Sequence, residues 1–370
     1  MKTVRRLLYR DIAGSVLFTA VAFLSLFFFI DFIDELENVG KQGYQAWHAA
    51  VLGLLAVPGH FYELIPIAVL IGSIYALARM AQSTEFTILR TGGLGPGRAL
   101  SLLATLGVAF AVVTWLVGDY VAPLSEREGV RLHNLYRGGS KFFRSSAWLK
   151  EHRETPEGER SYSVQVGSAS AQGHLEGVRI FEFDADGRLL SRIAAERATV
   201  DDDATWRLLD VEVVRWNASS LDGSPAVSEQ RMPTLSWPST LTAGVVAAAV
   251  LPIKTMSTIE LFRYTRHLAS NEQAGQRYEI QFWRKALYPL ACLVMIALAL
   301  PFAYMHARSG GISLKVFGGI MLGISFVLLN NVASHLGLLQ NWTPWIVAAV
   351  PSTIYLLLSL AAFSWLVRYR

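Results

Sequence analysis

The sequence has one cysteine and few charged residues. Cys292 has no second cysteine to pair with, so any soluble part of the chain must be held together without disulfides. Lys, Arg, Asp and Glu make up 17% of the 370 residues, whereas soluble domains have roughly 25%. The deficit is local, because long charge-free stretches flank a middle section of ordinary polarity. We therefore predict a membrane protein with one inserted soluble part.

The sequence also lacks the motifs of the common enzyme classes. It contains no G-x-x-x-x-G-K-[ST] phosphate loop, no H-E-x-x-H zinc motif and no G-x-S-x-G nucleophile motif. The glycine-rich residues 92–97 include no lysine and follow no predicted strand, which favours a turn. The eight histidines are scattered, and none are spaced as a local metal site. We predict a chain that is not an enzyme and holds neither a metal nor a cofactor.

Six apolar runs have about the length that crosses a bilayer. They cover residues 15–33, 64–80, 99–117, 286–305, 312–330 and 343–367. The first run is too long for a signal peptide and is followed by acidic residues, so it is predicted to be an uncleaved membrane helix. The second is predicted to begin near Ala49, with Pro58 and Pro66 kinking or breaking it.

Lys and Arg residues indicate the orientation of these runs. The N-terminal and C-terminal tails and the loops after the second and fourth runs are basic, whereas the loops after the first and fifth runs are not. This bias places both termini in the cytoplasm and residues 118–285 outside, in the periplasm of a Gram-negative bacterium. Arg284 and Lys285 run against the bias, since they flank the fourth run on the outside.

The outside insert has the pattern of short antiparallel strands. Strands are predicted at residues 161–166, 178–183, 188–200 and 206–216, with a turn at 184–187. Their spacing favours a β-sandwich or a jelly roll. The predicted fold is thus α-helical and membrane-embedded, with six transmembrane helices and an inserted periplasmic all-β, jelly-roll-like domain.

The insert is predicted to return to the membrane through a helix at residues 256–282. Ser257 is its expected N-cap, with Glu260 completing a capping box. The chain accordingly divides into three parts: residues 1–120, 121–255 and 256–370.

A short segment between the second and third runs has an apolar middle. Residues 82–91 form a predicted helix too short to cross a membrane, which Gly92 and Gly93 end. Such a helix could lie in a groove of a partner protein. From its composition alone, an ordinary connecting loop is the favoured interpretation.

Several short motifs, in their order along the chain, resemble the LptF/LptG family of lipopolysaccharide export permeases. They lie at residues 34–36, 82–93, 120–123, 181–189, 206–208 and 283–289. The order of three helices, a β-domain and three helices also agrees, so the resemblance covers nearly the whole chain. The stretch from Asp34 to Tyr44, with Gly40 and Gly43, is more similar to LptG than to LptF.

The resemblance implies a permease subunit that extracts lipopolysaccharide from the inner membrane while a partner hydrolyses ATP. It implies a heterodimer with an LptF-like permease, two LptB-like ATPase subunits, and hand-off of lipid to the periplasmic proteins LptC and LptA. It also places Glu85, Phe86, Leu89 and Arg90 in a coupling helix that docks on the ATPase.

Basic residues on the outer side are candidates for contact with lipid phosphates. They are Lys41, Arg131, Arg137, Arg284 and Lys285. The alternative is that their side chains snorkel at the interface. Members similar to LptG often have lysines at the outer end of the first helix, whereas this chain has mainly acids there. A divalent cation bridging those acids to phosphate is one compensation.

Polar residues near the outer ends of the first and fifth runs are candidates for a lateral gate. They are Asp31, Asp34, Asn330 and Asn331. For the two asparagines, hydrogen bonds between helices are the favoured alternative.

Two rival functions remain open. An ABC-type mechanical coupler that moves no lipid is disfavoured, because its outer domain would follow the first helix and here three runs precede it. A membrane sensor with a periplasmic ligand domain should carry a cytoplasmic signalling domain, and none is visible in the sequence.

Overall fold

The computed structural model divides into two compact units. The described residues are 2–40, 43–136, 147–155, 158–169, 174–200, 205–216, 227–250, 253–270, 275–304 and 311–368. The helical unit comprises Met1–Arg137 and Glu279–Arg370, and the β unit comprises Gly138–Tyr278. The candidates Lys41 and Arg137 lie outside the described residues.

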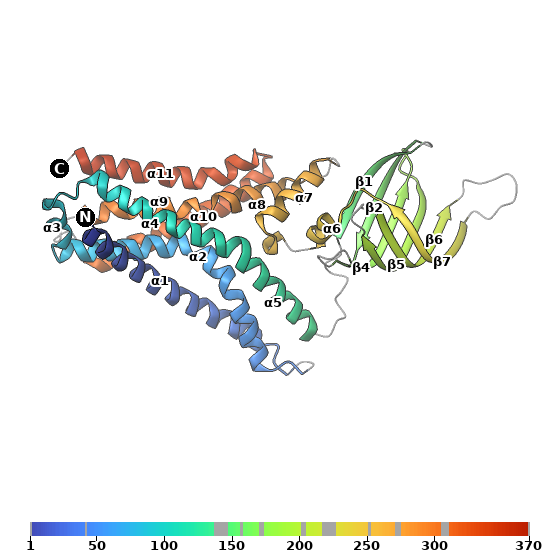
Figure 1. Cartoon of the computed structure of the whole chain (residues 1–370), viewed down its shortest axis with the longest axis horizontal. Helices are drawn as coiled ribbons and strands as arrows, with labels where there is room; N and C mark the ends of the chain where they lie inside the picture. The colour runs from blue at the N-terminus through green and yellow to red at the C-terminus, as the bar shows by residue number, and fades with distance from the viewer. Residues whose placement is uncertain are drawn as a thin grey trace. The chain divides into compact units, whose positions relative to one another are not determined.

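The helical unit contains long apolar helices connected by short segments (Figure 1). In chain order, the described helices of this unit, long and short, are α1 (Lys2–Leu36), α2 (Ala46–Gln82), α3 (Glu85–Thr91), α4 (Pro96–Leu116), the π-helix η1 (Val117–Val121), α5 (Ala122–Tyr136), α8 (Gln276–Leu287), α9 (Leu290–Tyr304), α10 (Ile312–Leu339) and α11 (Pro344–Arg368). Five helical segments in the described part are long and apolar enough to cross a membrane, or six when α8 and α9, bent by 51°, count as one. The prediction of a helical membrane protein is confirmed.

Helix α2 is the centre of this unit. It packs against α1, α5, α9 and α10. In an apolar stretch of 18 residues, 83% of α2 is buried, whereas 11% of the corresponding stretch of α1 is buried. The helix begins at Ala46 and includes both Pro58 and Pro66. Its first half bends and follows α1 away from α10 and α11 (Figure 1). The prolines therefore kink the helix without breaking it, because each removes one backbone donor and crowds the preceding turn.

A glycine allows α1 and α2 to approach closely. A Cβ added at Gly72 would lie 2.6 Å from the backbone N and Cα of Val16. Backbone atoms cannot move aside as a flexible side chain can, so only glycine fits at this crossing. Ile12, one turn before Val16 on α1, and Leu70, just before Gly72 on α2, are fully buried in the same apolar core. This core holds α1 against α2 by packing.

The β unit is one antiparallel sheet whose strands pair in the order β1-β2-β4-β5-β6-β7, with β3 paired to β4. The strands are β1 (Ala147–Thr155), β2 (Gly158–Val166), β3 (Ser168–Ala169), β4 (His174–Phe183), β5 (Leu189–Val200), β6 (Thr205–Trp216) and β7 (Val227–Pro238). The all-β prediction is confirmed. Neighbours along the path follow the chain, so within the described strands the sheet is a meander, without the Greek-key crossing of a jelly roll.

The predicted turn and the predicted cap are both present. Between β4 and β5, Gly187 has a positive φ of 77° and its N–H bonds to the carbonyl of Asp184. After the strands come α6 (Ala243–Val250), the 3-10 helix η3 (Ile253–Thr255) and α7 (Thr258–Ser270). The Ser257 N–H donates to Glu260 and the Glu260 N–H donates to the Ser257 hydroxyl, as in a capping box. The predicted helix 256–282 is represented by α7 and the start of α8.

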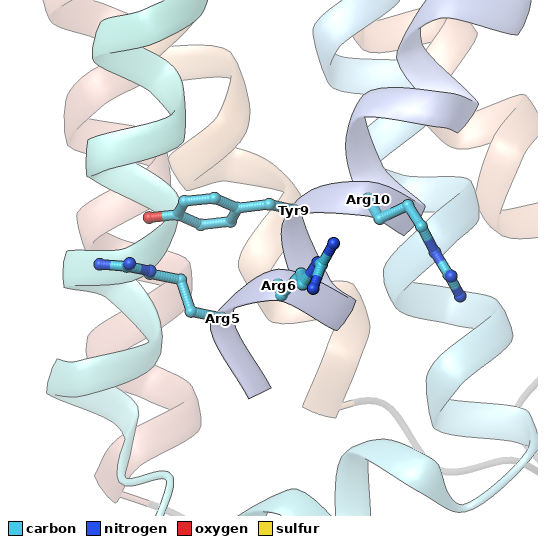
Figure 2. Close-up of a pocket in the computed structure, with 4 residues that line it drawn as sticks. All are labelled: Arg5, Arg6, Tyr9 and Arg10. Atoms are coloured by element: carbon cyan, nitrogen blue, oxygen red, sulfur yellow. The ribbon is translucent and has the colours of Figure 1, made fainter. Parts of the chain in front are cut away.

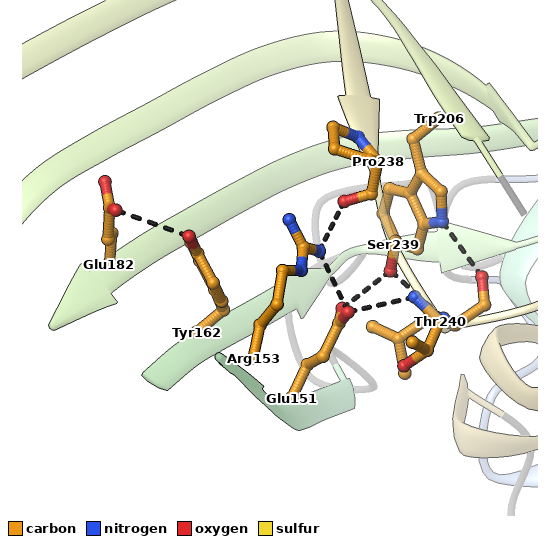
Figure 3. Close-up of polar contacts among 9 residues, drawn as sticks. Glu151, Arg153, Tyr162, Glu182, Trp206, Pro238, Ser239 and Thr240 are labelled. Carbon is orange, nitrogen blue, oxygen red and sulfur yellow. Dashed lines mark hydrogen bonds and ion pairs between the residues drawn. The ribbon is translucent and has the colours of Figure 1, made fainter. Parts of the chain in front are cut away.

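A buried carboxylate joins the two edge strands of the sheet. Glu151 on β1 is fully buried and accepts hydrogen bonds from Arg153, the Ser239 hydroxyl and the Thr240 N–H, at 2.9, 2.7 and 2.9 Å (Figure 3). Arg153 also donates to the carbonyl of Pro238, at the end of β7. Because β1 and β7 are the two ends of the strand order, these contacts require the sheet to curl until its edges meet.

Aromatic rings complete this clamp. The guanidinium of Arg153 lies 4.9 Å from the ring centroid of Tyr162 and 5.6 Å from that of Trp237. Trp206 is fully buried, packs edge-on against Trp237, and donates its indole N–H to the carbonyl of Leu241 (Figure 3). The pKa of the Tyr162 hydroxyl is raised by burial and by the nearby Glu182. We call Glu151, Arg153 and their partners here the edge clamp.

Candidate functional site

The short helix α3 is fastened to the helical unit through contacts with Tyr304 and with the main apolar core. Phe86 is buried and its ring meets that of Tyr304 edge-on at 5.1 Å. The guanidinium of Arg90, one turn later, lies 5.0 Å from the centroid of the same Tyr304 ring. Leu89 is partly buried against the main core. Three of the four predicted coupling residues thus hold α3 in place.

The end of α3 is as well defined as its middle. Gly93 has a positive φ of 96°, its N–H bonds to the carbonyl of Arg90, and the Leu94 N–H bonds to the carbonyl of Leu89 at 3.0 Å. These are the two bonds of a Schellman motif, which satisfy carbonyls left open at a helix end. Leu94 is buried beyond the turn. The predicted glycine end of this helix is confirmed.

The other side of α3 is exposed. Glu85 lies in the first turn with its side chain exposed, and Ile88 is 65% exposed. Positions three apart share a helix face, so an acid and an apolar side chain stand together on this face. Sequence reasoning did not single out Ile88. The sequence signal that could have identified it is its position: Ile88 is apolar but does not share the helix face of the buried Phe86.

Two of the quoted motifs meet against α2 farther along the bundle. The π-helix η1 contains Gly118, where a Cβ would overlap the ring of Tyr62 on α2. Tyr288, from the motif at residues 283–289, packs its ring 4.8 Å from the same Tyr62 and donates its hydroxyl to the carbonyl of Glu63. Asp119 is buried in the π-helix. Such bulges often mark functional positions.

The acidic C-terminal end of α1 lies beside two histidines. Asp31 lies 2.7 Å from the Nε2 of His60 on α2. Glu35, one turn later, accepts from the Tyr44 hydroxyl at 3.0 Å and lies 3.6 Å from the Nδ1 of His133 on α5. Sequence reasoning missed both histidines, because their partners are on other helices. These contacts link the end of α1 to its neighbours.

The remaining gate and headgroup candidates are dispersed over several elements. Arg131 is exposed on α5 and contacts Glu128 at 3.3 Å. Arg284 on α8 donates to the side-chain oxygen of Asn331 on α10 at 3.4 Å. The structure brings this pair together.

Three further candidates differ in their exposure. Lys285 is buried, whereas Asp34 is exposed. Asn330 is buried and donates to the carbonyl of Phe326 within its own helix. In the described part of the chain, no three His, Cys, Asp or Glu side chains gather closely enough to hold a metal ion.

Comparison with known proteins gives a match along almost the full length. The family described as "Lipopolysaccharide export system permease LptF/LptG" matches residues 6–366. The chain belongs to the LptF/LptG family. The lipopolysaccharide export system permease protein LptG of Escherichia coli K12 is 28% identical over 360 residues, 96% of each chain. LptG of Haemophilus influenzae Rd is 24% identical over 361 residues, 97% of each chain.

The resemblance seen in the sequence is confirmed by this match. As expected of an LptF/LptG protein, apolar helices precede and follow the inserted β unit. The relatives named above are LptG proteins, in agreement with the similarity of the Asp34–Tyr44 stretch. The chain is accordingly a multi-pass protein of the inner membrane and a member of a permease family.

Proposed function

We propose that this chain is the LptG-like permease subunit of a transporter that extracts lipopolysaccharide from the inner membrane. It would pair with an LptF-like permease, and two LptB-like ATPase subunits would drive it. Lipid would pass through the β unit to periplasmic LptC- and LptA-like proteins. The observation that carries the proposal is the family match over residues 6–366, which includes both helical parts and the insert.

The proposed orientation follows from the distribution of Lys and Arg. Both termini and α3 lie in the cytoplasm, and the β unit lies in the periplasm. Helix α3 then faces the compartment that supplies ATP. The β unit faces the compartment that the lipid must cross. This arrangement separates the energy source from the lipid path, as a transporter requires.

Helix α3 is the proposed contact with the ATPase. Phe86 and Arg90 fasten it to Tyr304, while Glu85 and Ile88 remain exposed. An apolar side chain beside a charge is typical of a small docking surface. When the ATPase subunits close on ATP, the force on this face passes through the Phe86–Tyr304 contact to α9. We propose that this movement narrows the lipid cavity between the two permeases.

The lipid contacts are proposed at the outer end of the helical unit. The exposed Arg131 and the half-buried Arg284 offer guanidinium groups to phosphate. Lys285 is buried and Lys41 and Arg137 are not among the described residues, so their proposed contacts rest on the sequence. Asp31, Asp34, Asn330 and Asn331 remain the proposed gate residues.

The test uses α3, because its two faces make different predictions. We expect Ile88→Glu and Glu85→Ala to reduce co-purification of the ATPase with the tagged chain, by up to about tenfold each for a loss of about 1.4 kcal/mol. Both side chains are exposed, so thermal unfolding should not change. ATP-driven release of lipopolysaccharide from proteoliposomes should fall in parallel.

Thr87→Ala is the matched control, since Thr87 is exposed on the same short helix but is not a surface neighbour of Glu85 or Ile88, and it should change neither readout. Normal ATPase association and normal lipid release in both α3 variants would contradict the coupling role. Normal association with no lipopolysaccharide release by the unaltered complex would contradict the proposed function itself.

A further inference from the structure

The first turns of α1 border an open cavity of about 550 Å³. Its lining residues are Arg5, Arg6, Tyr9 and Arg10 (Figure 2). Arg5 and Tyr9 are four residues apart, as are Arg6 and Arg10, so each pair consists of neighbours on the helix surface. Figure 2 shows Arg5 and Tyr9 extending to one side, Arg10 to the other, and Arg6 between them. Three arginines therefore line one open cavity.

These first turns of α1 are held in place by packing and by one hydrogen bond. Leu8 and Ile12 are buried in the main apolar core. The Tyr9 hydroxyl donates to the carbonyl of Leu102 on α4 at 3.1 Å. The helix consequently cannot rotate without breaking these contacts. The arginines are presented by a rigid element, which lowers the entropy lost when they bind an anion.

The positive charge at this cavity is poorly neutralised. The nearest acid in the chain is Asp11, whose Oδ2 lies 2.9 Å from Nη2 of Arg79 on α2. Arg10 reaches the same carboxylate only at 3.7 Å. Within the described residues, Arg5 and Arg6 make no ion pair. Among the described residues, the three lining arginines therefore make one ion pair, the long contact of Arg10 with Asp11, and the cavity favours an anion.

The surface of α1 beyond the arginines changes from charged to apolar. Following Arg6 and Arg10 at helical spacing come Gly14, Leu17 and Val21. A Cβ at Gly14 would meet nothing within 4 Å, so the helix is open there. Leu17 and Val21 are 63% and 53% exposed. We call Arg6, Arg10, Gly14, Leu17 and Val21 the stripe. It is charged at one end and apolar at the other, like a lipid, and Gly14 between the two ends has no side chain.

We propose that this stripe binds an anionic membrane phospholipid, with its phosphate at Arg6 and Arg10. The glycerol part lies over Gly14, and the acyl chains follow Leu17 and Val21. The acyl contact distinguishes a lipid from a free phosphate ion, which shares the same headgroup chemistry. The test of this site requires no lipopolysaccharide.

The test measures binding of fluorescent phosphatidylglycerol to the purified full chain, with its co-purifying partners, in neutral detergent. Arg6→Gln combined with Arg10→Gln should weaken binding about thirtyfold, because each arginine near an anionic headgroup contributes about 1 kcal/mol. Arg98→Gln combined with Arg215→Gln removes two exposed charges elsewhere and should leave binding unchanged. A phosphatidylcholine probe should bind weakly to all forms. Unfolding curves of both double variants should match the unaltered chain, since all four side chains are exposed.

Gly14→Leu tests the acyl contact while keeping every arginine. We expect it to weaken phosphatidylglycerol binding, because the new side chain fills the open part of the stripe. Inorganic phosphate at millimolar concentration should not displace the lipid. Equal losses in the two double variants would show bulk electrostatic attraction and overturn the site. Complete displacement by inorganic phosphate, or full binding by Gly14→Leu, would overturn the lipid assignment.

Discussion

The helical unit and the β unit are stabilised by contrasting contacts. The helical unit depends on close apolar packing, which at the crossing of α1 and α2 leaves no room for a Cβ on Gly72. The β unit depends on backbone ladders and on a buried charge, Glu151, that joins its two edges. A membrane helix satisfies its own backbone, so its neighbours need only fit in shape. A curled sheet has two free edges, and polar side chains must hold them together.

The largest effect is expected from breaking the edge clamp. Glu151→Ala removes the acceptor for Arg153, Ser239 and Thr240 and leaves buried donors unpaired. We expect about 3–5 kcal/mol lower stability of the β unit. Hydrogen exchange at the amides of β1 should then become faster, while exchange in α2 stays unchanged. Glu229→Ala, which removes an exposed acid of β7 that contacts Arg231, is the control. Unaltered protection of β1 would show that the clamp does not hold the sheet edges.

A smaller effect is expected from adding one methyl group to the helical unit. Gly72→Ala places a Cβ against the backbone of Val16 and should cost about 1–3 kcal/mol, as overpacking does. Thermal unfolding in detergent would measure it, with the β1 amides unaffected. Gly318→Ala is the matched control, because a Cβ there meets nothing within 4 Å. A Gly72→Ala protein as stable as this control would contradict the close crossing of α1 and α2.

The smallest effect concerns the dependence of the β unit on pH. Burial lowers the pKa of His267 on α7 below its ordinary value of 6.5, and Glu151 opposes the shift. Below about pH 6.5, His267 binds a proton in the unfolded chain but stays neutral in the folded unit. The free energy of unfolding therefore falls as the pH falls. The loss ends below the folded-state pKa. Hydrogen exchange of α7 between pH 7.5 and 5 would show it, and His267→Gln should remove it. Greater protection of α7 at the lower pH would reverse the sign and contradict the argument.

Elements with a regular hydrophobic pattern could be predicted from the sequence, whereas the edge strands of the sheet could not. Apolar runs and alternating strands were located correctly. Strands β1, β3 and β7 were missed. Strand β3 has only two residues. Strands β1 and β7 are edge strands, which carry charged residues, and Pro233 interrupts β7. In β6 the buried positions pass from Leu208 to Val211, out of period, at Asp210, whose φ is 56°. A change of phase within a strand is not visible to a search for strict alternation.

The candidate site was predictable in location and less so in detail. The segment around Glu85 was found from its motif, but which side of α3 faces out depends on Tyr304, far away in the chain. The pairing of Asp31 with His60 likewise requires the packing of α1 on α2. Contacts between distant segments depend on the tertiary structure, so the spacing of residues in a single sequence does not predict them.

The fastening of α3 at both ends has a mechanical consequence. Helix α2 ends at Gln82 and α4 begins at Pro96, so the two helices flank α3 with only a few residues between. The Schellman turn and the buried Leu94 leave this connection little slack. Under the proposed coupling role, a push on α3 would pass to α2 and α4 together. Because α2 packs along α1, the same push would also reach α1.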